Sequence, residues 1–260
     1  MPACVTDRVG LESRGMEMRY ASFRRAAYIV LGALTCTVLA ASDNVIVSVH
    51  SERDSKPAAN RNSSFWKKIQ GVTIANDSMG RPAPEYRTEV RSRWTRNNLY
   101  LLFVCRYEKL WLRPNPELTA ETNELWNWDV AEAFIAGDIE HVNRYREFEV
   151  SPRGEWVDLA IDRGAPRQAG VGGWTWNSGF QKVARVDEKQ HLWYAEMVIP
   201  WSALMATAPA VGGQLRANLF LSVGPTAEKK NLSWQATHSR TFHVPDAFGI
   251  LKLEKGTHVK

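Results

Sequence analysis

Four acidic residues in the middle of the chain have a spacing that could bring carboxylates together. Asp129 and Glu132 are close in sequence, and Glu147 and Glu149 share one face of an expected strand because side chains alternate along a strand. A glycosidase needs two carboxylates about 5–10 Å apart that flank the scissile bond. Acids at positions i and i+2 of one strand do not flank a bond from opposite sides. We therefore expect a non-catalytic domain, with glycoside hydrolysis as the alternative.

Aromatic residues are the second unusual feature. The chain has 11 Trp, and none of them precedes Trp66. Aromatic faces stack on the C–H patches of sugars, while charged and amide groups bond the hydroxyls. The loop after Trp234 contains Gln235, His238 and Arg240, which are good partners for hydroxyls. The sequence can therefore supply both parts of a sugar site.

Short apolar or alternating runs, separated by turn signals, would position these side chains. They predict strands over residues 88–94, 99–105, 130–136, 145–151, 155–161, 180–186, 191–199, 215–223 and 249–253. Residues 187–190 predict a hairpin turn, and residues 200–204 predict one short helix. Helical periodicity is otherwise nearly absent. The pattern predicts an all-β fold, an antiparallel β-sandwich of two sheets in the immunoglobulin or jelly-roll manner.

The N-terminal part has the pattern of an export signal. Three arginines, the last at Arg25, precede the uncharged and mostly apolar residues 26–39, and small residues follow at Ala40. The apolar run is short for a membrane span of about 20 residues, so an uncleaved anchor is the less favoured alternative. We expect a signal peptide with a long n-region over residues 1–41, a polar linker over 42–64, and one domain over 65–260. The protein is then exported to the periplasm, the cell surface or the medium.

The net charge limits the kinds of binding partner to expect. The net charge of +5 gives no reason to expect nucleic acid, and we expect no membrane contact once the signal is removed.

The three cysteines predict no internal disulfide in the exported protein. Cys4 and Cys36 lie in the part expected to be removed. Cys105 stands alone inside an apolar run, so we expect a small core residue and no internal disulfide.

Five segments, in order, resemble the family 9 carbohydrate-binding modules. Residues 125–135 (LWNWDVAEAFI) resemble the W-x-x-D-x-V-E-x-F-I block of that family, with one position shuffled. Residues 145–156 match its Y-x-x-F-x-V-x-P-x-G strand pair, and residues 94–103, 193–201 and 233–249 resemble its other segments. The resemblance implies a β-sandwich that binds an oligosaccharide or polysaccharide. It also implies a role in carbohydrate catabolism beside polysaccharide-degrading enzymes.

The resemblance also implies site residues. Two aromatic residues of that family sandwich the terminal sugar of a glycan chain, and they correspond to Trp126 and Phe242, although the family often has Trp at the second position. The acid of the block corresponds to Glu132, which would accept hydroxyl bonds. Glu149 falls where some members carry Arg, which changes the expected hydroxyl pattern. An alternative for Glu132 is an ion pair across the sheet with Arg91 or Arg93.

Three further interpretations stay open. Related sandwiches hold haem between a Met and a His, and Met79, Met197 and Met205 are present beside several histidines. A scaffold that binds other proteins is also compatible with the composition. The resembled modules often hold structural calcium, for which Asp77, Asp129, Asp138 and Asp158 remain as oxygen donors, without the spacing of a calcium loop.

Overall fold

The computed structural model describes residues 44–165, 176–207 and 209–256. Within these ranges it has thirteen strands, one α-helix, α1 (Trp201–Leu204), and four short 3-10 helices: η1 (Pro84–Tyr86), η2 (Leu125–Asn127), η3 (Thr226–Glu228) and η4 (Pro245–Ala247). The strands are β1 (Val45–His50), β2 (Val72–Ile74), β3 (Asn76–Asp77), β4 (Thr88–Trp94), β5 (Asn98–Arg106), β6 (Val130–Ala136), β7 (Arg144–Val150), β8 (Trp156–Asp162), β9 (Gln181–Asp187), β10 (Leu192–Pro200), β11 (Gln214–Val223), β12 (Lys230–Ser233) and β13 (Gly249–Glu254).

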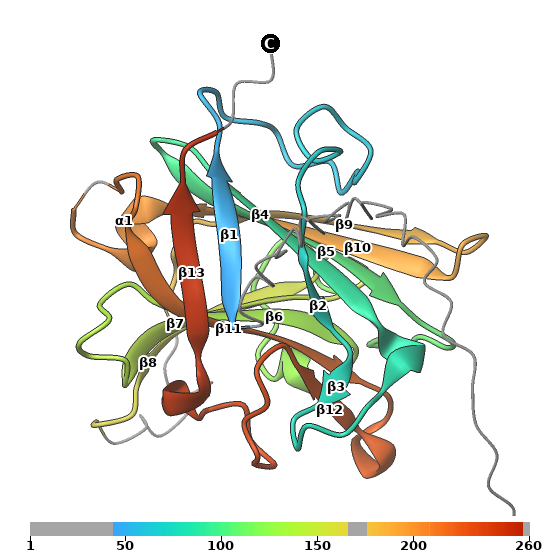
Figure 1. The fold of residues 1–260 in the computed structure, drawn as a ribbon. Helices are drawn as coiled ribbons and strands as arrows, with labels where there is room; N and C mark the ends of the chain where they lie inside the picture. Colours follow the sequence, from blue (N-terminus) through green and yellow to red (C-terminus); the bar gives the residue numbers. More distant parts are fainter. Residues whose placement is uncertain (1–43, 166–175, 208, 257–260) are drawn as a thin grey trace, which may run out of the picture. The chain divides into compact units, whose positions relative to one another are not determined.

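The strands form one hydrogen-bonded path that folds over into two layers. Its order is β8-β7-β6-β11-β13-β1-β4-β5-β10-β9. Strands β13 and β1 lie side by side where one layer passes into the other (Figure 1). All pairings on this path are antiparallel except those of β1, which runs parallel to both β13 and β4. The predicted all-β sandwich with one short helix is therefore confirmed, and β1 makes the sheet mixed.

The inner core lies between the two layers. From one layer it receives Ala131, Ala133 and Ile135 of β6, which alternate with residues on the opposite face. The other layer contributes side chains of β4, β5 and β10, including Phe103 and Cys105. Burial raises the pKa of the Cys105 thiol, which agrees with the expected inert core residue.

Both layers also bury much of their outer faces. On one layer, Tyr100 of β5 and Tyr194 of β10 pack under residues that precede β2, among them Trp66. On the other layer, Phe134 of β6 packs with Phe242 and with residues around η4. Because these clusters cover the outer faces, consecutive residues of β5, β6 and β10 are buried on both sides of the sheet.

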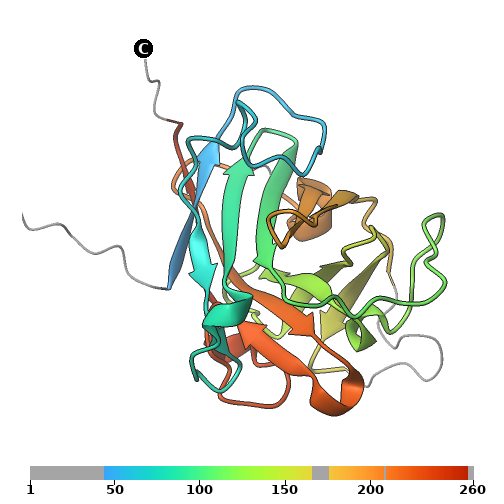
Figure 2. The same cartoon turned by 90° about the vertical axis from the view of Figure 1, so that its right-hand side faces the viewer.

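The prediction of a polar linker over residues 42–64 is wrong. Residues 45–50 form β1, which pairs with two other strands, and the segment after it is bonded to the domain. The carboxylate of Glu196 accepts the backbone N–H groups of Ala58 and Ala59 at 2.9 and 2.8 Å. Figure 2 shows this segment, in blue, as a loop that continues from the tip of β1 at the top of the view. Asp54 in this segment also accepts a hydrogen bond from the Tyr100 hydroxyl of β5 at 2.8 Å, so a polar side chain here helps to hold the segment on the domain.

The expected signal peptide lies outside the described residues. Among the residues that the structure does describe, no helix combines the length and the apolar character needed to cross a bilayer. The strands predicted from the sequence all occur, with ends shifted by at most one residue, and the hairpin over residues 187–190 joins β9 to β10.

Candidate functional site

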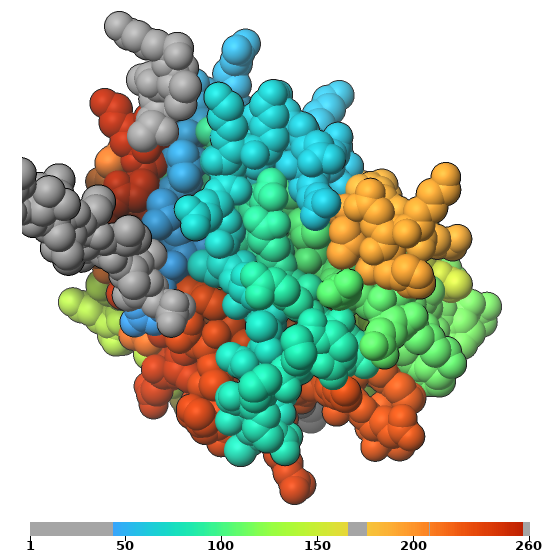
Figure 3. Space-filling view, turned by 45° about the vertical axis from the view of Figure 1, so that its right-hand side comes forward, coloured from blue at the N-terminus to red at the C-terminus, as the bar shows by residue number. Residues whose placement is uncertain are grey.

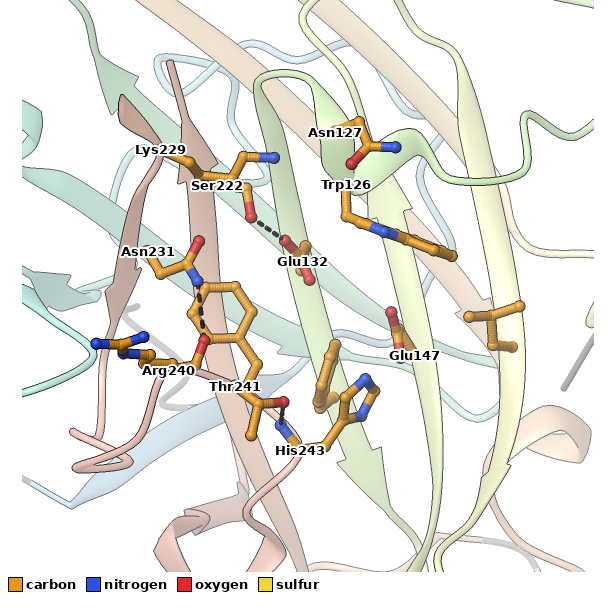
Figure 4. Close-up of a pocket in the computed structure, with 13 residues that line it drawn as sticks. Trp126, Asn127, Glu132, Glu147, Ser222, Lys229, Asn231, Arg240, Thr241 and His243 are labelled. Atoms are coloured by element: carbon orange, nitrogen blue, oxygen red, sulfur yellow. Dashed lines mark hydrogen bonds between the residues drawn. The ribbon is translucent and has the colours of Figure 1, made fainter. Parts of the chain in front are cut away.

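An open pocket of about 270 Å³ lies on the outer face of the layer that contains β6, β7 and β11. Two acidic side chains, Glu132 of β6 and Glu147 of β7, form part of its floor (Figure 4). The indole of Trp126 lies along one side, and the loop before η4 forms the opposite side. The residues that line it are Trp126, Asn127, Glu132, Phe134, Glu147, Leu159, Ser222, Lys229, Asn231, Arg240, Thr241, Phe242 and His243.

Local packing fixes the position of Trp126 between two anchors. Leu125 before it is fully buried, and Glu124 adopts a left-handed conformation (φ 59°) that starts the 3-10 turn η2. Asp129 after it accepts the backbone N–H of Trp111 at 2.8 Å and that of Gly224 at 2.7 Å. Burial raises the pKa of Asp129 to about 6, although these two bonds act in the opposite direction. The half-buried indole is thus held at the rim by residues that are not part of the pocket.

The second aromatic residue, Phe242, is packed into the protein and forms one wall of the pocket. Phe242 is only 7% exposed, and its ring stacks on Phe220 with the centroids 4.1 Å apart and the planes inclined by 16°. One face of Phe242 is therefore used within the protein, and only a small part of the ring can meet a ligand. The expected partner Trp126 lines the same pocket, so the structure brings the two aromatic residues to one cavity.

Three glutamates gather beneath the pocket. Glu132 and Glu149 are cross-strand partners on β6 and β7, and Glu147 is two residues from Glu149 on the same face. One carboxylate oxygen from each of the three lies within 4.8 Å of the others. All three are buried, at 2% exposure for Glu132, 3% for Glu147 and 0% for Glu149. This places up to three like charges in a site with little water.

Burial and mutual repulsion control the ionisation of these acids. Burial is the main cause that raises the pKa of Glu132 to about 8, and the charge of Glu147 adds to it. A hydrogen bond from the Ser222 hydroxyl at 2.8 Å acts in the opposite direction. Burial and the charges of Glu132 and Glu147 also raise the pKa of Glu149 well above its ordinary value. Burial lowers the pKa of the half-buried Lys229, while the acids of the cluster favour its charged form.

A second and wider cavity of about 940 Å³ adjoins the pocket. The two share Lys229, Asn231 and Arg240 as lining residues. The segment around residues 77–85 forms much of its other wall, and Figure 3 shows this segment, in blue-green, beside the orange and red parts of the chain on the surface. His238 lines this second cavity. An elongated ligand could therefore pass from one cavity to the other across Arg240.

Comparison with known proteins identifies the family. The model of the carbohydrate family 9 binding domain-like family matches residues 60–256. The chain belongs to this family. No curated protein is significantly similar to it.

Solved structures of family 9 and related binding proteins share the fold. A candidate carbohydrate-binding protein from Bacteroides uniformis is 15% identical, with a TM-score of 0.65 over 81% of this chain and 99% of that one. A family 9 module from Caldicellulosiruptor kristjanssonii in complex with cellotriose is 11% identical, with a TM-score of 0.56 over 82% of this chain and 95% of that one. The complex with glucose is 12% identical, with a TM-score of 0.54 over 82% and 97%. At these identities the likeness concerns the fold.

The site residues expected for a family 9 domain lie in four different places. Trp126, Phe242, Glu132 and Arg240 line the pocket. Glu149 lies behind it within the glutamate cluster, and His238 lines the second cavity. Gln235 lines neither of the two, and its backbone N–H and C=O bond the side chain of Asn218. Gln235, His238 and Arg240 therefore do not line one cavity together, although they belong to the same loop.

The alternative of an ion pair between Glu132 and the arginines of β4 is wrong. Arg91 pairs with Glu89 at 2.8 Å, and Arg93 donates to backbone carbonyls, including that of Phe65 at 2.7 Å. Both arginines lie on the opposite layer, where they donate hydrogen bonds to backbone carbonyls of the segment before β2. The sequence did not single out Lys229, Asn231 or Ser222 as pocket residues, because no motif surrounds them.

The four aspartates considered for calcium do not fit a shared site. Each is bonded to nearby groups: Asp77 to Arg81, Asp129 to two backbone N–H groups, Asp138 to His141 and Asp158 to Ser178. They belong to separate strands and loops. Within the described residues, the glutamate cluster is the group of three or more acids whose oxygens lie close together. For haem, Met197 is fully buried in the inner core, where it cannot face an open pocket.

Proposed function

We propose that this domain binds the end of a glucan-type oligosaccharide or polysaccharide in the pocket beside Trp126. The observation that carries the proposal is that an aromatic ring, an acid and a guanidinium group, those of Trp126, Glu132 and Arg240, line one open pocket. Such a set provides a stacking surface and charged hydrogen-bond partners for hydroxyls. The complexes of the Caldicellulosiruptor module with cellotriose and with glucose suggest β-glucans as the first ligands to test.

The contacts suggest a role for each side chain. The indole of Trp126 stacks on a sugar ring, and the edge of Phe242 limits its position from the other side. Glu132 and Glu147 at the floor meet hydroxyls, either as proton donors or as acceptors, since the pKa of Glu132 is raised to about 8. Arg240 and Lys229 meet the next unit of the chain at the entrance to the second cavity.

Calorimetric titration with cellotriose tests the proposal, because it reports binding without requiring a reaction. Trp126→Ala should abolish detectable binding and leave the melting temperature within about 2 °C of that of the parent, since the ring is half-buried at the rim. Trp111→Ala is the matched control: Trp111 is 36% exposed, stacks on Trp128 and lies outside the pocket. Equal binding by both variants, or a collapse of stability in Trp126→Ala, would refute the role of this ring.

Chemical reduction of the reducing-end sugar of cellotriose tests whether the domain binds that end of the chain. If the reducing end enters the pocket, cellotriitol should bind at least tenfold more weakly than cellotriose, since the closed ring that stacks on Trp126 is lost. Equal affinities would indicate that the pocket takes the other end or an internal unit.

The glutamates do not favour hydrolysis as the main function. All three come from adjacent positions on β6 and β7 and would approach a bound sugar from the same side. Hydrolysis requires carboxyl groups on both sides of the bond. Release of nitrophenol from nitrophenyl glucosides, lost in Glu132→Gln, would show that the domain is catalytic after all.

We also propose that the protein is exported and works beside polysaccharide-degrading enzymes. The basic residues and the short apolar run before Ala40 support export. Expression of the full chain with fractionation, followed by N-terminal sequencing of the exported form, tests this. A mature N-terminus at residue 41 or 42 is expected, and retention of the intact chain in the cytoplasm would exclude it.

A further inference from the structure

The second cavity has more basic than acidic side chains in its lining. Four lysine or arginine residues and two acids line it, namely Asp77, Arg81, Glu85, Lys229, Lys230 and Arg240. A cleft lined mainly by one sign of charge attracts ligands of the opposite sign, because its walls focus the electric field. Its volume of about 940 Å³ is within the range of small-ligand sites. The lining therefore favours a ligand with an anionic group.

Both acids of this cavity already form ion pairs with its other basic residues. Asp77 pairs with Arg81 at 2.7 Å, and the other acid pairs with Lys230 at 3.0 Å. Among the residues that the structure describes, no acidic oxygen lies within 4.0 Å of the ammonium of Lys229 or the guanidinium of Arg240. Lys229 and Arg240 are therefore the cations that can contact a ligand without breaking an ion pair.

The backbone at Arg240 is held in place, whereas its side chain is exposed. The backbone carbonyl of Arg240 accepts a hydrogen bond from the side-chain amide of Asn231 at 3.3 Å, and that of Ser239 accepts one from the Ser78 hydroxyl at 2.8 Å. Figure 4 shows the guanidinium of Arg240 directed away from Trp126. Because the backbone is already ordered, binding an anion costs only the ordering of the side chain.

The two cavities differ in charge along the path that an elongated ligand would follow. Glu132 and Glu147 form part of the floor of the first pocket, whereas Lys229 and Arg240 line both cavities where they meet. An anionic group on the sugar beside Trp126 would lie near the two glutamates, which disfavour it. The same group on the next sugar unit would lie near the two cations. The position of the charge on the ligand should therefore determine its affinity.

We propose that the second cavity binds an anionic group, a carboxylate or a sulfate ester, on the sugar unit next to the one that stacks on Trp126. The ligand class is then acidic oligosaccharides with a neutral terminal unit. Guanidinium and ammonium groups form charge-assisted hydrogen bonds to the oxygens of such anions. This inference rests on the proposed sugar binding and deepens it, because it adds a charge to the ligand and places that charge.

Matched disaccharides test the proposal by calorimetric titration of the full chain at low salt. Cellobiose is the neutral reference, and the charged probes have a carboxylate or a sulfate ester at C6 of one ring only. Probes with the charge on either ring cover both directions of entry into the pocket. One of the two isomers should bind about fivefold more tightly than cellobiose, and the other should not. About 0.5 M NaCl should remove most of this gain, because it screens exposed charges.

Failure of this inference can be told apart from failure of the proposed function. If cellobiose binds and no charged probe binds more tightly, the anion site is overturned and the sugar site stands. An equal gain for both isomers would show a general attraction without a defined site, and would also overturn the inference. If neither cellobiose nor any charged probe binds, both proposals are wrong.

Variants locate the anion. In Arg240→Gln the ratio of the affinity for the charged probe to that for cellobiose should fall to about one, and Lys229→Gln should reduce the same ratio at least twofold. Arg96→Gln is the matched control, because Arg96 is exposed in the turn between β4 and β5 and lines neither cavity. A ratio that is unchanged in both cavity variants, or lost equally in the control, would refute the site.

Discussion

Glu132 and Glu149 face each other directly across β6 and β7, and both are buried. Like charges at opposed positions of a sheet destabilise it, and burial adds the cost of lost hydration. The segment that carries Phe242 folds over the same face and completes its burial. A domain that only needed to be stable would place apolar residues at these positions, so the pair indicates a function.

Neutralising one member of this pair should stabilise the protein. We expect Glu149→Gln to raise the free energy of unfolding by about 1 kcal/mol, because an amide removes one buried acid and can donate to Glu132 or Glu147. Urea denaturation followed by tryptophan fluorescence measures the change. A loss of stability of similar size would show that the glutamate makes a structural bond that the amide cannot replace.

Phe242 should matter for stability in a way that Trp126 does not. Its ring is stacked on Phe220 and belongs to the outer core cluster, so Phe242→Ala should lower the free energy of unfolding by about 3 kcal/mol. The melting temperature should then fall by about 6–12 °C. Phe242→Leu is the control that retains most of the volume. A change in Phe242→Ala no larger than that in Trp126→Ala would mean that the stacked ring contributes little.

Most of the fold was predictable because its signals are local. The strands from β4 to β11 alternate or run apolar over seven or more residues, and turn residues separate them. Strand β1 was missed because its partners, β13 and β4, are distant in sequence and its flanks are polar. Strands β2, β3 and β12 have two to four residues, too few for a pattern to emerge.

The site was predictable only in part, because its geometry depends on strand register. The shared face of Glu147 and Glu149 follows from the alternation of a strand, but the pairing of Glu149 with Glu132 does not. Their burial depends on the loop before η4, whose path no local signal determines. For the same reason the loop residues Gln235 and His238 were grouped with Arg240, although only Arg240 reaches the pocket.

Asp54 should make the domain sensitive to acid. Its carboxylate accepts bonds from Thr95 (2.5 Å), Asn97 (2.6 Å), Asn98 (3.0 Å) and Tyr100 (2.8 Å). Burial acts to raise its pKa, but these four bonds together lower the pKa to about 2, below the ordinary value of 3.8. A folded-state pKa below the unfolded value gives stability that is present above about pH 4 and is lost as the pH falls through about 2.

The difference between the parent and Asp54→Asn tests this. Urea midpoints at pH 6 should differ clearly, and the difference should shrink between pH 4 and pH 2 as Asp54 takes up a proton. Asp246→Asn, at an exposed position of η4, serves as the control. A difference that stays constant over this range would mean that the four bonds do not depend on the charge.

Glu196 should hold the segment before β2 against the sheet. Its carboxylate, 1% exposed on β10, accepts the N–H groups of Ala58 (2.9 Å) and Ala59 (2.8 Å) and the indole N–H of Trp66 (3.0 Å). Glu196→Ala leaves these three donors without their acceptor, which should lower the free energy of unfolding by about 3 kcal/mol. It should also speed proteolytic cleavage within residues 51–64 under native conditions, because local opening becomes easier.

The conservative variant separates the charge from the acceptor. Glu196→Gln keeps one oxygen in place and should lose less stability than Glu196→Ala, with cleavage between that of the parent and that of the alanine variant. Mass spectrometry of limited digests identifies the cleavage sites. Unchanged cleavage within residues 51–64 in Glu196→Ala would show that apolar packing around Trp66 alone holds the segment.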